Sequence, residues 1–215
     1  MDGNTLQGKL YAGYAAAAQR IGISFAQYRP TVGTPALGIG NQVGSVLAAF
    51  DTGPFAFTKP QDYGKATWTC LADGRLLLPG DYLSASSGTY FIASMQPLLP
   101  IMAVLCNRTV TVWRPQQQAA IGPLGYGGST QTNETAIADA FPASVLAASK
   151  TGHAPTNLPG DVPDAWYTLL LPGLPGGMQM LAHDVVTDDL NNRYVLSSVE
   201  LSGLGWRCSM MQAET

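Results

Sequence analysis

The sequence carries little charge for its length. Only 12% of its 215 residues are Asp, Glu, Lys or Arg, about half of the roughly 25% that is usual in soluble domains. The hydrophobic fraction of 46% is ordinary, so glycine, proline and uncharged polar residues take the place of the missing charges. Such a surface suits a subunit that its neighbours cover. The alternative is a loop-rich protein with a neutral surface.

Residue patterns that carry enzyme or metal chemistry are also missing. The three cysteines, Cys70, Cys106 and Cys208, are odd in number and far apart, which excludes a disulfide framework and metal-ligand spacing. The two histidines, His153 and His183, stand in separate segments. No G-x-S-x-G, H-E-x-x-H, Cys-x-x-Cys or Walker motif occurs. We therefore expect no enzyme activity, no metal and no cofactor.

The segment 183–189 holds the two strongest hints of chemistry. His183 precedes Asp184, but neighbouring residues of a strand point to opposite faces, so they are a poor base–carboxylate pair. Asp184, Asp188 and Asp189 offer oxygen ligands for a cation but lack the spacing of a calcium loop. A solvated hairpin turn is the favoured interpretation.

Basic residues are too sparse for a nucleic-acid surface. Residues 1–115 hold eight Lys and Arg against five Asp and Glu, and residues 116–215 hold three against nine. A nucleic-acid footprint needs clustered basic side chains, and no apolar run approaches the length of a membrane span. We expect neither sequence-specific nucleic-acid binding nor a membrane partner.

The N-terminal part predicts a helix followed by a long extended arm. Leu10, Tyr14, Ala17 and Ile21 recur at helical spacing and Gly22 follows them, which predicts a helix over residues 4–21. Residues 22–66 are interrupted by Gly and Pro, so they predict an extended arm with at most one short element at "SVLAAF". A long arm needs a groove on another subunit to become ordered. The predicted subunit-interface residues are Arg20, Phe25, Tyr28, Arg29, Val32, Leu37, Ile39 and Phe50.

The rest of the chain predicts two similar β-units. Strand and turn signals fill residues 67–115, and a related text returns in 165–215, where "TYFIASM" is answered by "RYVLSSV". Residues 116–164 predict a polar linker with a short helix at "TAIADAFPASVLAAS". We therefore expect a mainly β protein, with two small tandem barrel or sandwich units after the helix and arm at 1–66. Chance convergence of two ordinary hairpins is the alternative.

One stretch resembles a known type of protein. The text "LPGDYLSASSGTYFIASMQPLLPIMAVLCNRTVTVWRP", which follows the helix "LQGKLYAGYAAAAQRIG" and a Pro-rich arm, resembles structural proteins of tailed bacteriophages over residues 5–115. The chain is similar, more faintly, to head–tail joining proteins, in which a comparable hairpin lies in a small β-barrel around the DNA channel. Those proteins are commonly half as long.

The resemblance implies a non-enzymatic structural subunit of the virion tail apparatus, made in the host cytoplasm. It forms a ring with copies of itself and contacts other tail, neck or baseplate proteins, either joining tail tube to baseplate or acting as a connector at the portal. A carbohydrate- or peptide-binding module is a different reading. It would use Trp68, Tyr82, Tyr90 and Trp113 as exposed, coplanar stacking rings.

Overall fold

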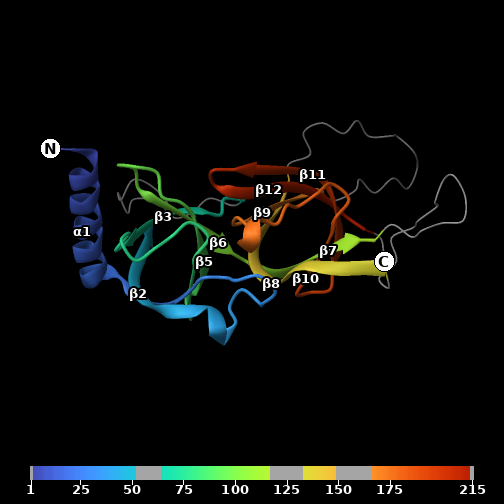
Figure 1. Cartoon of the computed structure of the whole chain (residues 1–215), viewed down its shortest axis with the longest axis horizontal. Coiled ribbons are helices and arrows are strands. Elements are labelled where there is room, and N and C mark those ends of the chain that lie inside the picture. The colour runs from blue at the N-terminus through green and yellow to red at the C-terminus, as the bar shows by residue number, and fades with distance from the viewer. Residues whose placement is uncertain (1, 52–63, 117–132, 149–165, 214–215) are drawn as a thin grey trace, which may run out of the picture.

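The chain folds into a helix and two β-barrels that follow one another along the long axis of the molecule (Figure 1). The computed structural model describes residues 2–51, 64–116, 133–148 and 166–213. Strands β1 to β6 close barrel 1 and strands β7 to β12 close barrel 2. The elements are α1 (Gly3–Ile21), β1 (Ile23–Tyr28), η1 (Ile39–Asn41), β2 (Gln42–Asp51), β3 (Thr67–Ala72), β4 (Tyr82–Ala85), β5 (Gly88–Ser94), β6 (Ile101–Cys106), β7 (Arg108–Pro115), β8 (Glu134–Ala147), β9 (Trp166–Leu171), η3 (Pro175–Gly177), β10 (Val185–Asp188), β11 (Arg193–Ser202) and β12 (Gly205–Gln212).

The predicted N-terminal helix is present as α1. The Asp2 carboxylate accepts a hydrogen bond from the Thr5 N–H at 2.7 Å and so caps the first turn. Gly22 ends the helix, and its N–H donates to the Ala18 carbonyl. Tyr11 and Tyr14 pack toward the core of barrel 1. None of the helices in the described ranges is both long and apolar enough to span a membrane.

The two barrels share one topology. Around barrel 1 the strands run β1-β2-β3-β6-β5-β4, and around barrel 2 they run β7-β8-β9-β12-β11-β10, so each strand of barrel 2 takes the place of the strand six positions earlier. Every pairing is antiparallel. The predicted pair of tandem β-units is confirmed.

The equivalence extends to individual residues. Leu83 pairs with Tyr90 in barrel 1, and Val186 pairs with Tyr194 in barrel 2, as the aligned texts "TYFIASM" and "RYVLSSV" require. A bulge also interrupts both sheets at the same place, between Ile92 and Ser94 and again between residues 196 and 198. Two ordinary hairpins that converged by chance would not share a strand order and a bulge, so the likeness reflects a repeated unit.

The predicted boundaries differ from the observed ones. Barrel 1 begins at Ile23, because β1 and β2 lie in the segment that the sequence predicted to be an extended arm. Barrel 2 begins at Arg108, because β7 crosses from the end of the predicted first unit into the second barrel. The arm prediction was wrong because Phe25 and Gln27 alternate inward along β1, and the polar Gln27 hid this period of two.

A second correction concerns the predicted helix at 135–149, since residues 134–147 form the strand β8. Pro142 lacks an N–H and would break a helix there. A strand tolerates it near an irregular pairing, and β8 has one, with Ala140 in the left-handed region at φ 52°. Most of the remaining predicted linker, residues 117–132 and 149–165, lies outside the described residues.

The barrels are packed together through a shared apolar core. Inside barrel 1, Leu83, Tyr90 and Ile92 belong to one buried cluster. The side chains between them on the same strands, among them Tyr82 and Phe91, belong to the cluster that fills barrel 2. Strands β4 to β6 are therefore buried on both faces, and the Tyr82 hydroxyl donates to the Pro142 carbonyl of β8 at 2.8 Å.

Helix α1 packs on the face of barrel 1 that is equivalent to the face of barrel 2 on which barrel 1 packs. It packs on β2 and β3, whereas the equivalent strand β8 packs on β6 of barrel 1. The loop after β3 touches the helix so closely that a Cβ on Gly74 would lie 2.5 Å from the Tyr11 ring. The equivalent loop after β9 approaches barrel 1 at Gly80, where the Gly173 carbonyl would lie 3.9 Å from an added Cβ. The chain is thus a helix-capped series of two repeats.

Candidate functional site

Each barrel carries an Arg–Asp clasp between its first strand and its hairpin β4–β5 or β10–β11. In barrel 1, Arg29 donates from Nε and Nη2 to the two oxygens of Asp81 at 2.7 and 2.8 Å. Gln27 and the Leu78 N–H donate to the same carboxylate at 2.7 and 2.9 Å. Asp81 is buried, with 1% of its side chain exposed, and its hydrogen bond raises the pKa of Arg29. The clasp holds β1 against the hairpin.

Barrel 2 repeats this clasp. Arg114 donates from Nε and Nη2 to the two oxygens of Asp184, both at 2.9 Å, and the Leu181 N–H donates at 2.7 Å. The hydrogen bond to Asp184 raises the pKa of Arg114. Val112 takes in barrel 2 the position that Gln27 has in barrel 1, since each residue directly precedes the aromatic residue of its strand. The clasps were not predicted from the sequence, although the two arginines lie in a repeated motif, "YRP" at 28–30 and "WRP" at 113–115.

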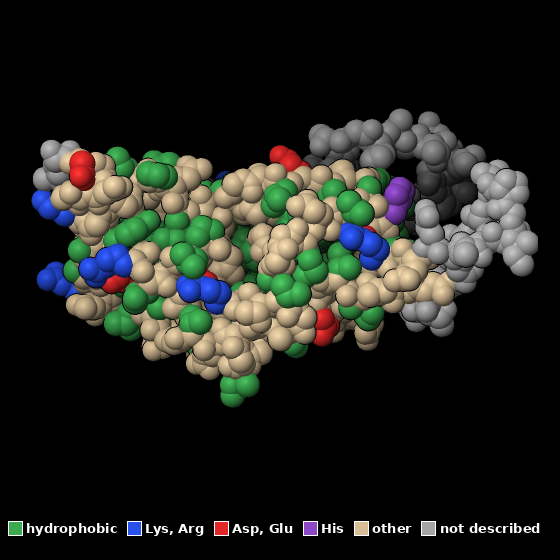
Figure 2. Space-filling model, in the orientation of Figure 1, with side chains coloured by type: hydrophobic (Ala, Val, Ile, Leu, Met, Phe, Trp, Pro, Cys, Tyr) green, Lys and Arg blue, Asp and Glu red, His purple; other side chains and the backbone are tan. Residues whose placement is uncertain are grey.

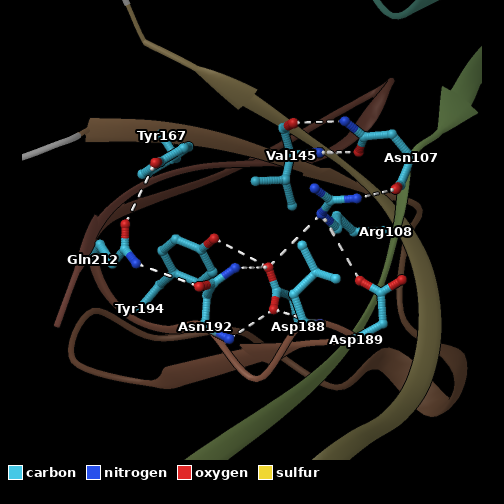
Figure 3. Close-up of polar contacts among 10 residues, drawn as sticks. Asn107, Arg108, Val145, Tyr167, Asp188, Asp189, Asn192, Tyr194 and Gln212 are labelled. Atoms are coloured by element: carbon cyan, nitrogen blue, oxygen red, sulfur yellow. Dashed lines mark hydrogen bonds and ion pairs between the residues drawn. The ribbon is translucent and has the colours of Figure 1, made fainter. Parts of the chain in front are cut away.

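The mouth of barrel 2 beside the β10–β11 turn is closed by a polar network (Figure 3). Asp188 stands at its centre and accepts from the N–H groups of Leu190 and Asn192 at 2.9 and 2.8 Å. The Asn192 side chain and the Tyr194 hydroxyl donate to it at 3.0 and 3.1 Å. Arg108 Nε lies 3.8 Å from Asp188 and 3.9 Å from Asp189.

The network fixes the charge state of its members. Burial acts to raise the pKa of Asp188, but the hydrogen bonds from Asn192, Leu190 and Tyr194 together outweigh it, so the pKa is lowered. Burial and the adjacent Asp188 carboxylate raise the pKa of Tyr194 to about 12. A carboxylate with four donors has little acceptor capacity left for a ligand. The arrangement serves as a structural plug.

The same mouth of barrel 1 is an apolar pocket. It encloses about 440 Å³ and is lined by Ile21, Ile23, Phe25, Ala48, Ala49, Phe50, Trp68, Ser87 and Tyr90. Phe50 and Tyr90 stack face to face with ring centroids 3.7 Å apart, and Phe25 and Trp68 meet Tyr90 edge-on. The indole N–H of Trp68 is buried with no hydrogen-bond partner in the described part of the chain. The pocket can hold an apolar group.

The two mouths differ at two equivalent positions, where barrel 2 has a charged residue and barrel 1 has an apolar one. Arg108 stands six residues before Arg114 of the clasp, and Ile23 stands at the equivalent position six residues before Arg29. Where barrel 2 has Asp188, barrel 1 has Ala85. The tyrosine is common to both, and in barrel 1 it lies among aromatic rings.

The predicted interface residues fall into three groups. Phe25 and Phe50 belong to the core and mouth of barrel 1, so their own barrel covers them. Tyr28 and Leu37 pack against the core shared by the barrels, and Arg29 pairs with the buried Asp81 of its own chain. The exposed group consists of Arg20 at the end of α1, Val32, of which 60% is exposed, and Ile39, of which 91% is exposed.

The acidic and histidine residues of segment 183–189 do not form a site. The side chain of His183 is exposed, and its backbone N–H donates to the Leu196 carbonyl at 2.8 Å. Asp184 is engaged by Arg114, and Asp188 is engaged by the plug. Among the described residues, no group of three or more His, Cys, Asp or Glu side chains could hold a metal ion. His153 lies outside the described ranges.

The cysteines are placed as apolar residues. Cys70 and Cys208 are buried in the two cores, and burial raises the pKa of each thiol to about 12. Cys106 is half-buried between the barrels, and burial raises its pKa as well. Thiols with pKa values this high are poor nucleophiles at neutral pH.

The four rings of the predicted stacking platform are separated. Tyr82 is fully buried between the barrels, and Tyr90 is buried inside barrel 1. Trp68 lines the mouth of barrel 1, whereas Trp113 lies on barrel 2. They do not form one exposed, coplanar surface, so the geometry gives no support to a platform made of these residues.

The candidate site is therefore the apolar mouth of barrel 1. Comparisons of the chain with protein-family models, with curated protein sequences and with solved structures find no match.

Proposed function

We propose that the chain is a non-enzymatic structural subunit of a tailed-phage virion, which forms a ring or clamp that joins the tail tube to the baseplate or to the neck. The observation that carries the proposal is the helix-capped series of two equivalent barrels, packed side by side through an apolar face. Repeats of this kind stack by burying the same face again and again. The low charge of the sequence supports the same conclusion.

The geometry of the polar groups fits an architectural role. The buried carboxylates described above are saturated by partners inside their own barrel. Catalysis by acid–base groups needs a titratable side chain within reach of a substrate, and the clasps and the plug do not present one. The proposal therefore assigns the polar clusters to folding and the apolar surfaces to contacts between subunits.

The test has two steps. Mass spectrometry of purified virions of the phage that encodes the chain is expected to find it as a stoichiometric component, and gold-labelled antibody is expected to mark one place on the tail. Label at the tail tip supports the baseplate clamp, and label beneath the head supports the portal connector. A chain that is abundant in infected cells but missing from washed virions would contradict the proposal.

A control addresses the non-enzymatic part. We expect that replacement of His183 by Ala leaves particle assembly and infectivity nearly unchanged, because no acid–base partner faces this exposed side chain in the described structure. Normal assembly accompanied by a large loss of infectivity would point to chemistry at this residue.

A further inference from the structure

The chain passes from barrel 1 to barrel 2 through a single residue. Strand β6 ends at Cys106 and β7 begins at Arg108, so only Asn107 lies between them. The two strands belong to different barrels, since Cys106 pairs with Thr89 of barrel 1 and Arg108 pairs with Ala143 of barrel 2. Asn107 is therefore the point at which the polypeptide leaves one barrel for the other.

The departure of β6 leaves a gap in the ladder between β7 and β8. Because Arg108 pairs with Ala143, a continued register would place Cys106 opposite Val145. Cys106 pairs in barrel 1 instead. A residue opposite Val145 could exchange both backbone hydrogen bonds with it, and the main chain of β7 does not reach that far.

The side chain of Asn107 fills this gap. Its Nδ2 donates to the Val145 carbonyl and its Oδ1 accepts from the Val145 N–H, both at 2.8 Å (Figure 3). The backbone N–H of Asn107 donates to the Ala143 carbonyl at 3.0 Å. A carboxamide offers the same kinds of donor and acceptor as a peptide group, so the side chain supplies the rung that the main chain cannot.

The equivalent junction of barrel 1 has no such rung. Gly22 directly precedes β1, as Asn107 directly precedes β7. A Cβ on Gly22 would lie 2.5 Å from the Ala18 carbonyl oxygen of α1 and 2.9 Å from that of Ala48, so no side chain fits there. The amide rung is therefore a feature of the junction between the barrels and not of the repeated unit.

The apolar core and the hydrogen bonds do different work at this junction. The shared core holds the barrels together, and the space-filling view shows them as one elongated body (Figure 2). Hydrophobic burial is non-directional, whereas a hydrogen bond depends on its angle. The hydroxyl of Tyr82 donates to Pro142, and the amide of Asn107 engages Val145, so both contacts end on β8. Two directional contacts on one strand define an angle that either contact alone leaves free.

We propose that Asn107 is a conformational latch that fixes the angle between the two barrels. By completing the ladder of β8, its amide holds the chain in one direction at the junction and prevents barrel 1 from rocking on the shared core. This role goes beyond the proposed function and does not depend on it, since every contact of the latch lies within one chain.

The first experiment measures the distance between the barrels by electron paramagnetic resonance. Nitroxide labels are attached at Ser45→Cys in barrel 1 and Ser198→Cys in barrel 2, both exposed positions, and labelled wild type controls for the natural cysteines. We expect Asn107→Ala to broaden the distance distribution, because the junction loses its directional contact. Thr109→Ala is the matched control and should leave the distribution unchanged, since Thr109 is an exposed residue near the start of the same strand.

The second experiment follows hydrogen exchange of the Val145 N–H by NMR. Asn107→Ala should speed this exchange by about tenfold, because the N–H loses its acceptor. Asn107→Asp keeps an acceptor for the N–H but has no donor for the Val145 carbonyl at neutral pH. We therefore expect this variant to protect the N–H and still to broaden the distance distribution. A distribution as narrow as that of the wild type would contradict a latch that needs both halves of the amide.

The distance measurement separates a latch from a contact that only stabilises the fold. A merely stabilising contact would lower the urea midpoint of Asn107→Ala and leave the distance distribution of the folded protein as it is in the wild type. That result would overturn the proposal, and so would unchanged exchange at the Val145 N–H. Circular dichroism verifies that each variant is folded. Asn107→Leu, which keeps the shape of the side chain without its amide, serves if Asn107→Ala is not.

Discussion

Barrel 1 and barrel 2 have the same strands in the same order, yet their mouths are built from opposite chemistry. Barrel 1 opens into an aromatic pocket around Tyr90. Barrel 2 closes the same opening with Arg108, Asp188 and Asn192 around Tyr194. The interior rows and the Arg–Asp clasps are common to both. The residues that close each barrel are therefore alike in the two copies, whereas the residues at the mouth are not.

The outer face shows the second difference. In barrel 1 the face is covered by barrel 2, so that Phe91 and Val104 are buried, whereas the equivalent Val195 and Met211 of barrel 2 are half-buried. The same position therefore contributes differently to stability in the two copies, because the free energy of burial depends on the area removed from water. Substitutions at paired positions test this directly.

The largest effect is expected where the two barrels pack on each other. Phe91→Ala should lower the free energy of unfolding by about 3–5 kcal/mol, because the ring is fully buried between the barrels. Val195→Ala, at the equivalent position of barrel 2, should cost less than about 1 kcal/mol in the monomer. Urea unfolding measures both values. Equal costs would show that the two faces are buried alike and would break the comparison.

The second-largest loss in the free energy of unfolding is expected at the clasps. Asp81→Ala removes the acceptor of Arg29, Gln27 and the Leu78 N–H, and we expect a cost of about 2–4 kcal/mol. Asp184→Ala should cost less, because barrel 2 has Val112 in place of the glutamine and one donor fewer loses its acceptor. Chemical denaturation of the two variants compares them. A larger loss for Asp184→Ala would contradict this ranking.

The plug of barrel 2 gives an effect that depends on pH. The folded-state pKa of Asp188 is lowered from 3.8, so its stabilisation is present above that pH and is lost as the pH falls through the lower folded value. Asp188→Asn should cost about 1–3 kcal/mol at neutral pH and flatten the decline below about pH 4. Thermal unfolding from neutral to acidic pH measures it. If the stability of Asp188→Asn declined with falling pH as steeply as that of the wild type, the Asp188 carboxylate would not be a source of the acid dependence.

The smallest effect is expected at the residue before each clasp aspartate. Gly80 has φ 93° and His183 has φ 72°, both in the left-handed region. Gly80→Ala should cost about 1–2 kcal/mol, because a side chain is strained there. His183→Gly should gain up to about 1 kcal/mol by relieving the same strain. Melting temperatures compare the pair, and a stabilising Gly80→Ala would be inconsistent with equivalent turns.

Several features were readable from the sequence because local rules determine them. The helix ends at Gly22, as predicted, and Tyr90 and Tyr194 occupy equivalent positions in the two barrels, as the alignment of their segments predicted. The β-class and the two tandem units follow from short alternating runs and turn signals, which depend on nearby residues alone. The same local reasoning failed at β1, where an inward glutamine interrupts the apolar alternation, and at β8, where alanines favour a helix in isolation.

The membership of each strand in one or the other barrel depends on contacts between distant segments. Residues 23–51 lack a continuous apolar signal and become strands only because β4 and β3 offer them backbone partners and because Asp81 accepts the hydrogen bonds of Gln27 and Arg29. Asp81 lies 54 residues from Gln27 and 52 residues from Arg29 in the chain, beyond the reach of any local pattern. From the sequence alone, two tandem β-units and an N-terminal helix were predictable. The assignment of β7 to the second barrel, and the full burial of Phe91 against the half-burial of the equivalent Val195, follow from long-range contacts. The same alternating strand can be covered to different degrees according to what packs on it.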